Sequence, residues 1–175
     1  MANVEYWLDT NCFITPHQGP YRFHWNTNLW DFLTKKAQDH IIGSPLVVLK
    51  CELENTGHED ELAKWAQNLY KEGILFVQPN GLVNGCQSEV VNHVSKYTCN
   101  NSYIRAFCDH ADSWLIAYAK AYGGKIVTFE RYDPLTKKPK IPNVAEELYG
   151  DIECMDLWDA LDELGYSHNF NVDIV

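Results

Sequence analysis

The chain has 175 residues, 46% of them hydrophobic and 13% aromatic, and a formal net charge of −10 at pH 7. This composition argues against disorder and supports one globular domain over residues 1–175. The negative charge argues against a protein that binds nucleic acid through a general basic surface. It leaves room for a metal-dependent nuclease, because bound cations attract phosphate.

No stretch approaches the roughly 20 apolar residues that span a bilayer, and the N-terminus lacks the basic and apolar regions of a signal peptide. We therefore expect a cytoplasmic protein with no membrane segment. Six cysteines are spread along the chain without a CxxC pair, which is typical of reduced thiols rather than a disulfide framework. Cys99, Cys108 and His110 match no standard zinc spacing.

Strand and helix patterns alternate along the chain. Val4–Leu8 is predicted as the first strand, and Thr15–Thr27, with two prolines and a glycine, as an irregular loop. The next predicted elements are a helix over Asn28–Asp39, a strand at Ile41–Ile42, a helix that opens at Ser44–Pro45 and runs to about Asn55, a helix over Glu59–Glu72 and a strand over Ile74–Val77.

The second half continues this alternation. Its predicted elements are a helical stretch over Gln87–Phe107 interrupted around Cys99–Ser102, a helix over Ala111–Tyr122, a strand over Lys125–Thr128, a polar segment over Arg131–Pro142, an element at Asn143–Tyr149, a strand over Ile152–Met155 and a helix over Asp156–Leu164. Strands separated by helices imply parallel pairing through crossovers. The expected fold class is therefore α/β, a three-layer α/β/α sandwich with a central, mainly parallel sheet.

Four acids stand at the ends of these elements. Asp9 directly follows the first strand, at the carboxyl end where open α/β sheets place their ligands. Glu52, Asp112 and Glu130 likewise lie inside or just beyond apolar segments. A carboxylate is costly there unless it is paired, hydrogen-bonded or bound to a metal. Together the four indicate a divalent-metal site.

Each acid also has a simpler interpretation. Asp9 could cap a turn, with Asn11 either supporting its carboxylate or continuing that turn. Thr128, two residues before Glu130, could hold a water at a metal or cap a loop. Asp109 and Asp112 both suit a helix N-terminus. Asp112 is preferred because it precedes an apolar run.

Glu52 and Glu54 compete for one position. On an ideal helix they point about 160° apart, so only one of them faces the site easily. Glu52 shares its face with Val48, four residues earlier, and is therefore the preferred site residue.

The order strand–Asp, helix–Glu, Asp–helix and strand–Thr–x–acid resembles the PIN-domain superfamily of metal-dependent ribonucleases. The resemblance covers most of the chain and is carried by Leu8–Asn11, Glu52–Leu53, Ala111–Ala119 and Val127–Glu130. The loop with Tyr21–Trp25 and the segment Lys140–Val144 look like a PIN-like subgroup found in prokaryotes. Two departures are the final acid, Glu130, where many PIN domains carry Asp, and the longer intervening loops.

The resemblance implies a PIN-like fold and an endoribonuclease that hydrolyses RNA phosphodiester bonds with Mg²⁺ or Mn²⁺. Asp9, Glu52, Asp112 and Glu130 would be its catalytic and metal-binding residues, with Asn11 and Thr128 in support. It also implies the toxin of a toxin–antitoxin pair, with a cognate antitoxin as partner. The alternative is a non-catalytic PIN-like module that binds RNA or protein. A haloacid-dehalogenase-type phosphotransferase is set aside, because that chemistry requires Asp where Asn11 stands.

Residues around the four acids suggest an RNA surface. The loop after Glu130 carries cations that either contact the RNA backbone or are simply solvated: Arg131, Lys137, Lys138 and Lys140. Aromatic residues earlier in the chain either stack on unpaired bases or belong to the core: Tyr21, Phe23, Trp25 and Trp30. The sequence leaves open whether the protein forms a homodimer.

Overall fold

The computed structural model describes residues 4–54, 60–98 and 100–167. Within them, parallel strands form a single sheet in the order β3-β2-β1-β4-β5. Their bounds are Tyr6–Leu8 (β1), Ile42–Pro45 (β2), Phe76–Val77 (β3), Lys125–Val127 (β4) and Cys154–Met155 (β5). The chain adds β2 and β3 on one side of β1 and then returns to place β4 on the other. The topological switch point of the sheet therefore lies between β1 and β4.

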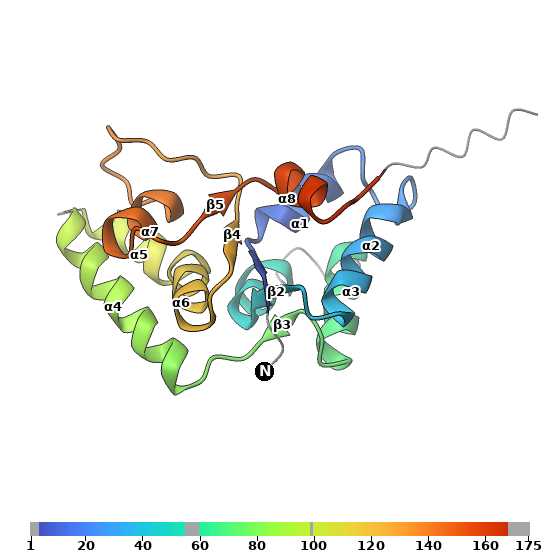
Figure 1. Ribbon diagram of the computed structural model, residues 1–175, viewed down its shortest axis with the longest axis horizontal. Helices are drawn as coiled ribbons and strands as arrows, with labels where there is room; N and C mark the ends of the chain where they lie inside the picture. The colour runs from blue at the N-terminus through green and yellow to red at the C-terminus, as the bar shows by residue number, and fades with distance from the viewer. Residues whose placement is uncertain (1–3, 55–59, 99, 168–175) are drawn as a thin grey trace, which may run out of the picture.

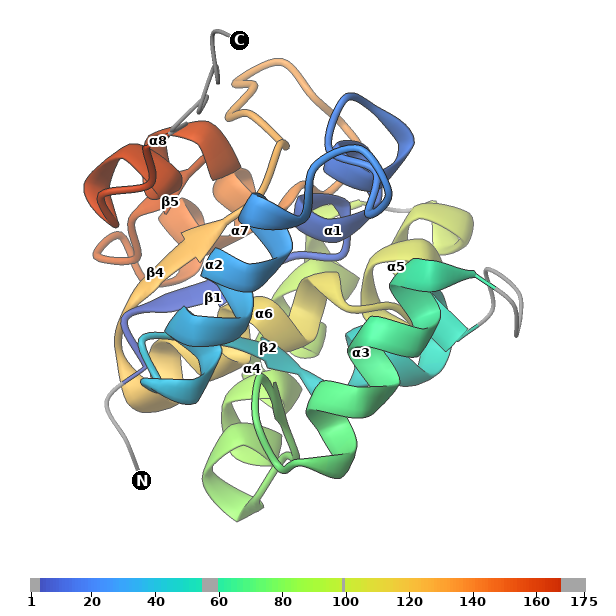
Figure 2. The ribbon, with the colours of Figure 1, turned by 90° about the vertical axis from the view of Figure 1, so that its right-hand side faces the viewer.

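Helices cover both faces of the sheet, and Figure 1 shows the two layers on either side of the strands. Successive side chains of a strand point to opposite faces, so Tyr6 and Leu8 enter one core and Trp7 enters the other. The layer over Tyr6 and Leu8, seen from outside in Figure 2, contains α1 (Asn11–Gln18), α2 (Thr27–Gln38), the π-helix η1 (Val48–Leu53), α3 (Glu61–Lys71) and α8 (Leu157–Glu163). The layer over Trp7 contains α4 (Gly81–Tyr97), α5 (Asn101–Cys108), α6 (Asp112–Tyr122) and α7 (Ile141–Leu148). The predicted three-layer α/β/α class is thus confirmed.

The connection from α6 to β4 shows why glycine follows this helix. Gly124 has φ +95°, and a Cβ there would lie 2.9 Å from the carbonyl oxygens of Val4 and Glu5. That close approach lets the amide of Lys125 donate to the carbonyl of Glu5 at 2.8 Å and start the β1–β4 pairing. Only glycine fits this backbone path without strain.

Two local predictions are wrong. Ser44 and Pro45 do not cap a helix but end β2, where the Ser44 hydroxyl donates to the carbonyl of Leu8 at 2.8 Å. Helical residues begin only at Leu46 and then widen into η1. Part of the predicted irregular loop is α1, which contains Pro16 within its eight residues. Burial of Pro16 in the core accompanies the loss of one helical hydrogen bond.

The other elements fall close to their predicted positions, with ends shifted by a few residues and α4 beginning earlier, at Gly81. The predictions at Asn55, Glu59 and Cys99 lie outside the described residues. Every cysteine that the structure describes is free. In the described ranges, no helix combines the length and apolar character needed to cross a membrane.

Candidate active site at the switch point of the sheet

Asp9 and Thr128 meet where β1 and β4 end. The amide of Asp9 donates to the carbonyl of Val127 at 2.9 Å, which continues the strand pairing beyond Leu8. The Thr128 hydroxyl then donates to Asp9 Oδ2 at 2.9 Å, and the amide of Thr10 donates to Asp9 Oδ1 at 2.7 Å. Asp9 is therefore a buried carboxylate held at the switch point by two donors.

Burial raises the pKa of Asp9 from its usual range to about 6. The hydrogen bonds from Thr128 and Thr10 oppose this rise because they favour the charged form, while the negative charges of Glu52 and Glu130 add to it. The charges of two other predicted site acids therefore act on the Asp9 carboxylate.

Asp112 is the first residue of α6. Burial raises its pKa well above the usual range, and repulsion from Asp9, Glu130 and Glu52 adds to the rise, while Lys138 opposes it. Within the described part of the chain, the Asp112 carboxylate has no hydrogen bond and no ion pair. It is the site acid whose charge is least compensated.

Glu52 reaches the site from η1. Its Oε1 accepts a hydrogen bond at 3.2 Å from the amide of Ala111, the residue that precedes α6. The competing acid, Glu54, is instead paired with Lys50 at 2.7 Å. The choice of Glu52 over Glu54 therefore agrees with the geometry. A π-helical turn of this kind is rare and occurs frequently at functional sites.

Glu130 reaches the site from the loop after β4. Its amide donates to the Thr128 hydroxyl at 3.2 Å, and its Oε2 accepts from the amide of Ile141 at 2.8 Å. Ile141 begins α7, so the Glu130 carboxylate satisfies a free amide at that helix N-terminus. Like Glu52, Glu130 thus has one carboxylate oxygen occupied by backbone.

The donor set fits a hard divalent cation, because Mg²⁺ and Mn²⁺ prefer carboxylate oxygens. The unpartnered carboxylate of Asp112 is the strongest indication. No group of three His, Cys, Asp or Glu side chains in the described ranges is arranged as a ready ligand set. To share one ion, Glu52 and Glu130 must turn their second oxygens toward Asp9 and Asp112.

The supporting residues differ in outcome. Thr128 contacts both Asp9 and Glu130. Asn11 is exposed, and no hydrogen bond joins it to Asp9 in the described structure. Thr10, to which the sequence analysis assigned no role, is buried beside Asp9, and its hydroxyl has no hydrogen-bond partner among the described residues. The position of Thr10 directly after Asp9 in the sequence could have indicated that it lies beside the site.

The predicted cations are distributed unevenly around the site. Lys138 lies close enough to Asp112 to oppose the rise of its pKa. Lys140 pairs with Asp133 at 3.6 Å, and Arg131, which is 88% exposed, lies 3.9 Å from Asp156. Lys137 is exposed. Lys138 is therefore the cation of this loop that acts electrostatically on the acid cluster.

Asn143 orders the same loop and was missed by the sequence reasoning. Its buried side chain accepts from the amide of Asp133 at 3.1 Å and donates to the carbonyl of Asp133 at 2.9 Å. These bonds fix the chain between Glu130 and α7. No local pattern marks Asn143, because its partner lies ten residues earlier.

Most of the aromatic residues suggested for base stacking belong to the core. Trp30 is buried, stacks on Phe23 with ring centroids 4.2 Å apart, and donates to the carbonyl of Tyr21 at 2.7 Å. Tyr21 packs near Trp158. Trp25 differs, being 67% exposed.

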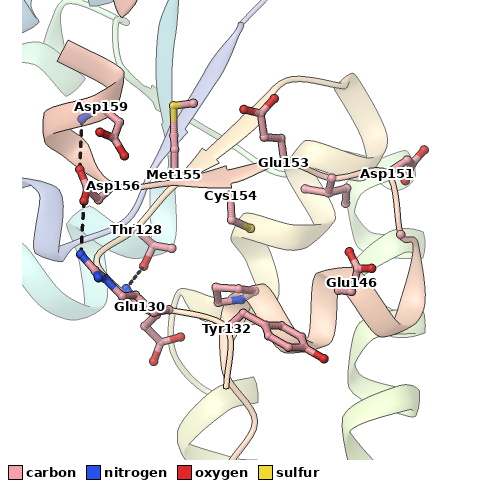
Figure 3. A pocket seen from close by; sticks show the side chains of 14 residues that line it. Thr128, Glu130, Tyr132, Glu146, Asp151, Glu153, Cys154, Met155, Asp156 and Asp159 are labelled. Carbon is pink, nitrogen blue, oxygen red and sulfur yellow. Dashed lines mark hydrogen bonds and ion pairs between the residues drawn. The ribbon is translucent and has the colours of Figure 1, made fainter. Parts of the chain in front are cut away.

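A cavity of about 940 Å³ adjoins the acid cluster, and Figure 3 shows it from close by. Thr128, Glu130 and the two residues after Glu130 contribute to its lining, and the rest comes from α7, the segment between α7 and β5, β5 itself and the start of α8. Asp9, Glu52 and Asp112 are not part of this lining. The cavity is thus connected to the candidate site but extends away from it.

Residues 6–168 match a family described as Domain of unknown function (DUF4411). The chain belongs to this family. The matched range includes Asp9, Glu52, Asp112 and Glu130, so the whole candidate site lies inside the DUF4411 domain. A search of the curated proteins found no match.

Proposed function

We propose that this DUF4411 domain is a PIN-like endoribonuclease that hydrolyses RNA phosphodiester bonds with Mg²⁺ or Mn²⁺. The observation that carries the proposal is the uncompensated carboxylate of Asp112, whose neighbours Asp9, Glu52 and Glu130 come from three other segments. Carboxylates gathered in this way repel one another, so the site gains free energy by binding a cation or sharing a proton.

Each acid has a distinct task in this proposal. Asp9 and Asp112 would hold the ion directly, because burial raises the pKa of both and a bound cation would offset the cost of their charged forms. Glu52 and Glu130 would add their second oxygens while the first remain on the amides of Ala111 and Ile141. Thr128 keeps Asp9 ionised and oriented through its hydroxyl. When bound, the ion would lower the pKa of an attacking water and offset charge on the phosphate.

A protein with a net negative charge requires local positive charge to attract RNA. Lys138 supplies positive charge beside Asp112, and Lys137 and Arg131 extend it along the exposed loop. These side chains would contact backbone phosphates. Arg131 is 88% exposed and would leave Asp156, 3.9 Å away, whereas Lys140 is half-buried and paired with Asp133 at 3.6 Å.

The test is cleavage of a labelled single-stranded RNA by the purified chain with Mg²⁺, with Mn²⁺ and with chelator. We expect metal-dependent cleavage that falls at least 100-fold in Asp112→Asn, since the substitution removes a charged ligand at nearly constant volume. Asp109→Asn is the matched control, because Asp109 is an exposed acid three residues earlier. Cleavage that survives in Asp112→Asn would point to a contaminating nuclease and refute the site.

A second candidate is a non-catalytic module that binds RNA or protein. The observation that favours it is the use of Glu52 and Glu130 as acceptors for backbone amides, a structural role that needs no metal. Isothermal titration with Mn²⁺ separates the two proposals. The nuclease requires saturable binding that Asp112→Asn abolishes, and the module requires none.

The toxin of a toxin–antitoxin pair is the more specific form of the nuclease proposal, supported by the PIN-like order of acids. Expression of the chain alone should then slow growth of the host, and Asp9→Asn should relieve the effect. A cognate antitoxin would cover the acid cluster, where an inserted Arg or Lys could replace the charge of the metal. Normal growth at every expression level of the wild type would contradict the toxin assignment.

A further inference from the structure

Among the described residues, no strand pairs with the outer edge of β5. β5 is the last strand of the sheet and joins β4 through bonds from the amide of Ile126 to the carbonyl of Glu153 at 2.8 Å and from Thr128 to Met155 at 2.9 Å. Backbone groups of alternate residues face opposite edges of a strand. The amide and carbonyl of Cys154 therefore face away from β4, toward the side where the described sheet ends.

The cavity of about 940 Å³ lies along this edge. Figure 3 shows Cys154 and Met155 on β5 between two walls. Glu146 on α7 belongs to one wall, and Asp156 and Asp159 at the start of α8 belong to the other. An open strand edge between two helices has the form that a further strand can occupy.

The lining of this cavity is strongly acidic. Among the described residues that line it, the carboxylates are Glu130, Glu146, Asp151, Glu153, Asp156 and Asp159, and the one cation is Arg131. Two of these acids are partly compensated, since Glu153 lies 3.2 Å from Lys125 and Asp156 lies 3.9 Å from Arg131. Among the described residues, the exposed acids Glu146 and Asp151 take part in no ion pair. The charge disfavours phosphate backbones and a second copy of a chain that carries −10.

We propose that this edge binds an extended segment of a partner protein that bears Lys or Arg at alternate positions. The segment adds to β5 as a sixth strand, pairing with the amide and carbonyl of Cys154, as in strand-addition recognition. Because alternate side chains of a strand share one face, its basic side chains point toward the layer that contains α7 and meet the carboxylates of Glu146 and Asp151. The proposal concerns binding alone and does not depend on nuclease activity.

The probe is a fluorescein-labelled, acetylated and amidated Lys-Val-Arg-Val-Lys peptide, measured by fluorescence anisotropy with the full chain. We expect saturable binding that weakens with salt, because surface charge pairs are screened. A Glu-Val-Glu-Val-Glu peptide should not bind. Two N-methylated versions of the basic peptide keep its charges. One is methylated at both valine amides and the other at the remaining three residue amides, so the two peptides lack opposite sets of strand donors. Only one of the two should lose binding.

Charge reversal of the wall supplies a matched pair of variants. Glu146→Lys with Asp151→Lys should weaken peptide binding about tenfold, as expected when two favourable surface pairs become repulsive. Asp31→Lys with Glu72→Lys changes the net charge equally at exposed sites away from the cavity and should leave the affinity within about twofold.

Hydrogen exchange locates the bound strand. Saturating peptide should slow exchange of the Cys154 amide, whereas the amides of Ile126 and Thr128 are already paired and should change little. Equal binding of both N-methylated peptides, or binding without protection of Cys154, would overturn strand addition and leave only charge attraction. Absence of binding would overturn the proposal outright. The nuclease proposal is tested separately by RNA cleavage, so neither failure implies the other.

Discussion

Thr128 donates its hydroxyl proton to Asp9 Oδ2 at 2.9 Å, across 119 residues of sequence. The Thr128 hydroxyl oxygen also accepts from the amide of Glu130 at 3.2 Å. One hydroxyl therefore joins the ends of the two strands that flank the switch point and orients two acids of the candidate site. This bond lowers the pKa of Asp9 against the larger effect of burial.

Thr128→Val should remove this link with little change in shape. We expect unfolding free energy at pH 7.5 to fall by about 2 kcal/mol, because a buried carboxylate and the Glu130 amide each lose a partner. Metal-dependent RNA cleavage should fall with it. Thr128→Ser keeps the hydroxyl and should cost about 1 kcal/mol or less, the contribution of one methyl group. Urea unfolding measures both, and equal losses in the two variants would contradict a role for the hydroxyl.

The pKa of Asp9, raised to about 6, predicts how stability depends on pH without metal. Between pH 4 and 6 the folded protein retains a proton that the unfolded chain has already lost, so unfolding free energy falls as pH rises through this window. Ionising Asp9 in the fold then costs about 3 kcal/mol. The unfolding free energy of Asp9→Asn should lack this fall with rising pH.

Urea unfolding of wild type and Asp9→Asn from pH 4 to 8, in chelator, checks this sign. As pH rises toward 7, the unfolding free energy of Asp9→Asn should increase relative to that of the wild type. Mn²⁺ should stabilise the wild type more at pH 7.5 than at pH 5, because ligands bind metal in their deprotonated form. Parallel profiles would mean that folding does not raise the pKa of Asp9.

The positions of Asp9 and Glu130 at strand ends could be predicted from sequence, because apolar runs locate the strands and parallel connectivity gathers their carboxyl ends at one edge. The partners of the acids could not. Glu52 contacts the amide of Ala111, 59 residues away, and does so from a π-helix that no helical periodicity indicates. The contact between Glu130 and Ile141 likewise depends on how the loop between them folds.

The start of the second helical segment shows the same limit. Ser44 and Pro45 carry the local signature of a helix N-terminus, yet both belong to β2. Pairing with β1 and β3 and burial of all four residues of the strand outweigh that local preference. Apart from α1, local signals predicted which elements exist, while tertiary contacts decided where this one begins.

Glu130 has a structural and a proposed catalytic task that two substitutions separate. Glu130→Ala should cost about 1 kcal/mol of stability, because the amide of Ile141 at the start of α7 loses its acceptor. Glu130→Gln keeps an acceptor and should be nearly neutral in stability, but should lower RNA cleavage several-fold through loss of charge. Glu146→Gln, an exposed position on α7, is the matched control for cleavage. Thermal unfolding and cleavage rates together show whether the two tasks separate as expected.

Lys138 and Lys140 lie two residues apart and should affect RNA binding differently. Lys138 acts electrostatically on Asp112, whereas Lys140 is paired with Asp133 at 3.6 Å. Lys138→Gln should raise KM for RNA several-fold at low salt and reduce the dependence of log KM on log salt by about one phosphate contact, with kcat less affected. Lys140→Gln should change both quantities less, because its charge is already partly compensated. Steady-state cleavage at several salt concentrations measures the two slopes. Identical effects in the two variants would show that the loop contributes only general charge rather than a phosphate contact beside Asp112.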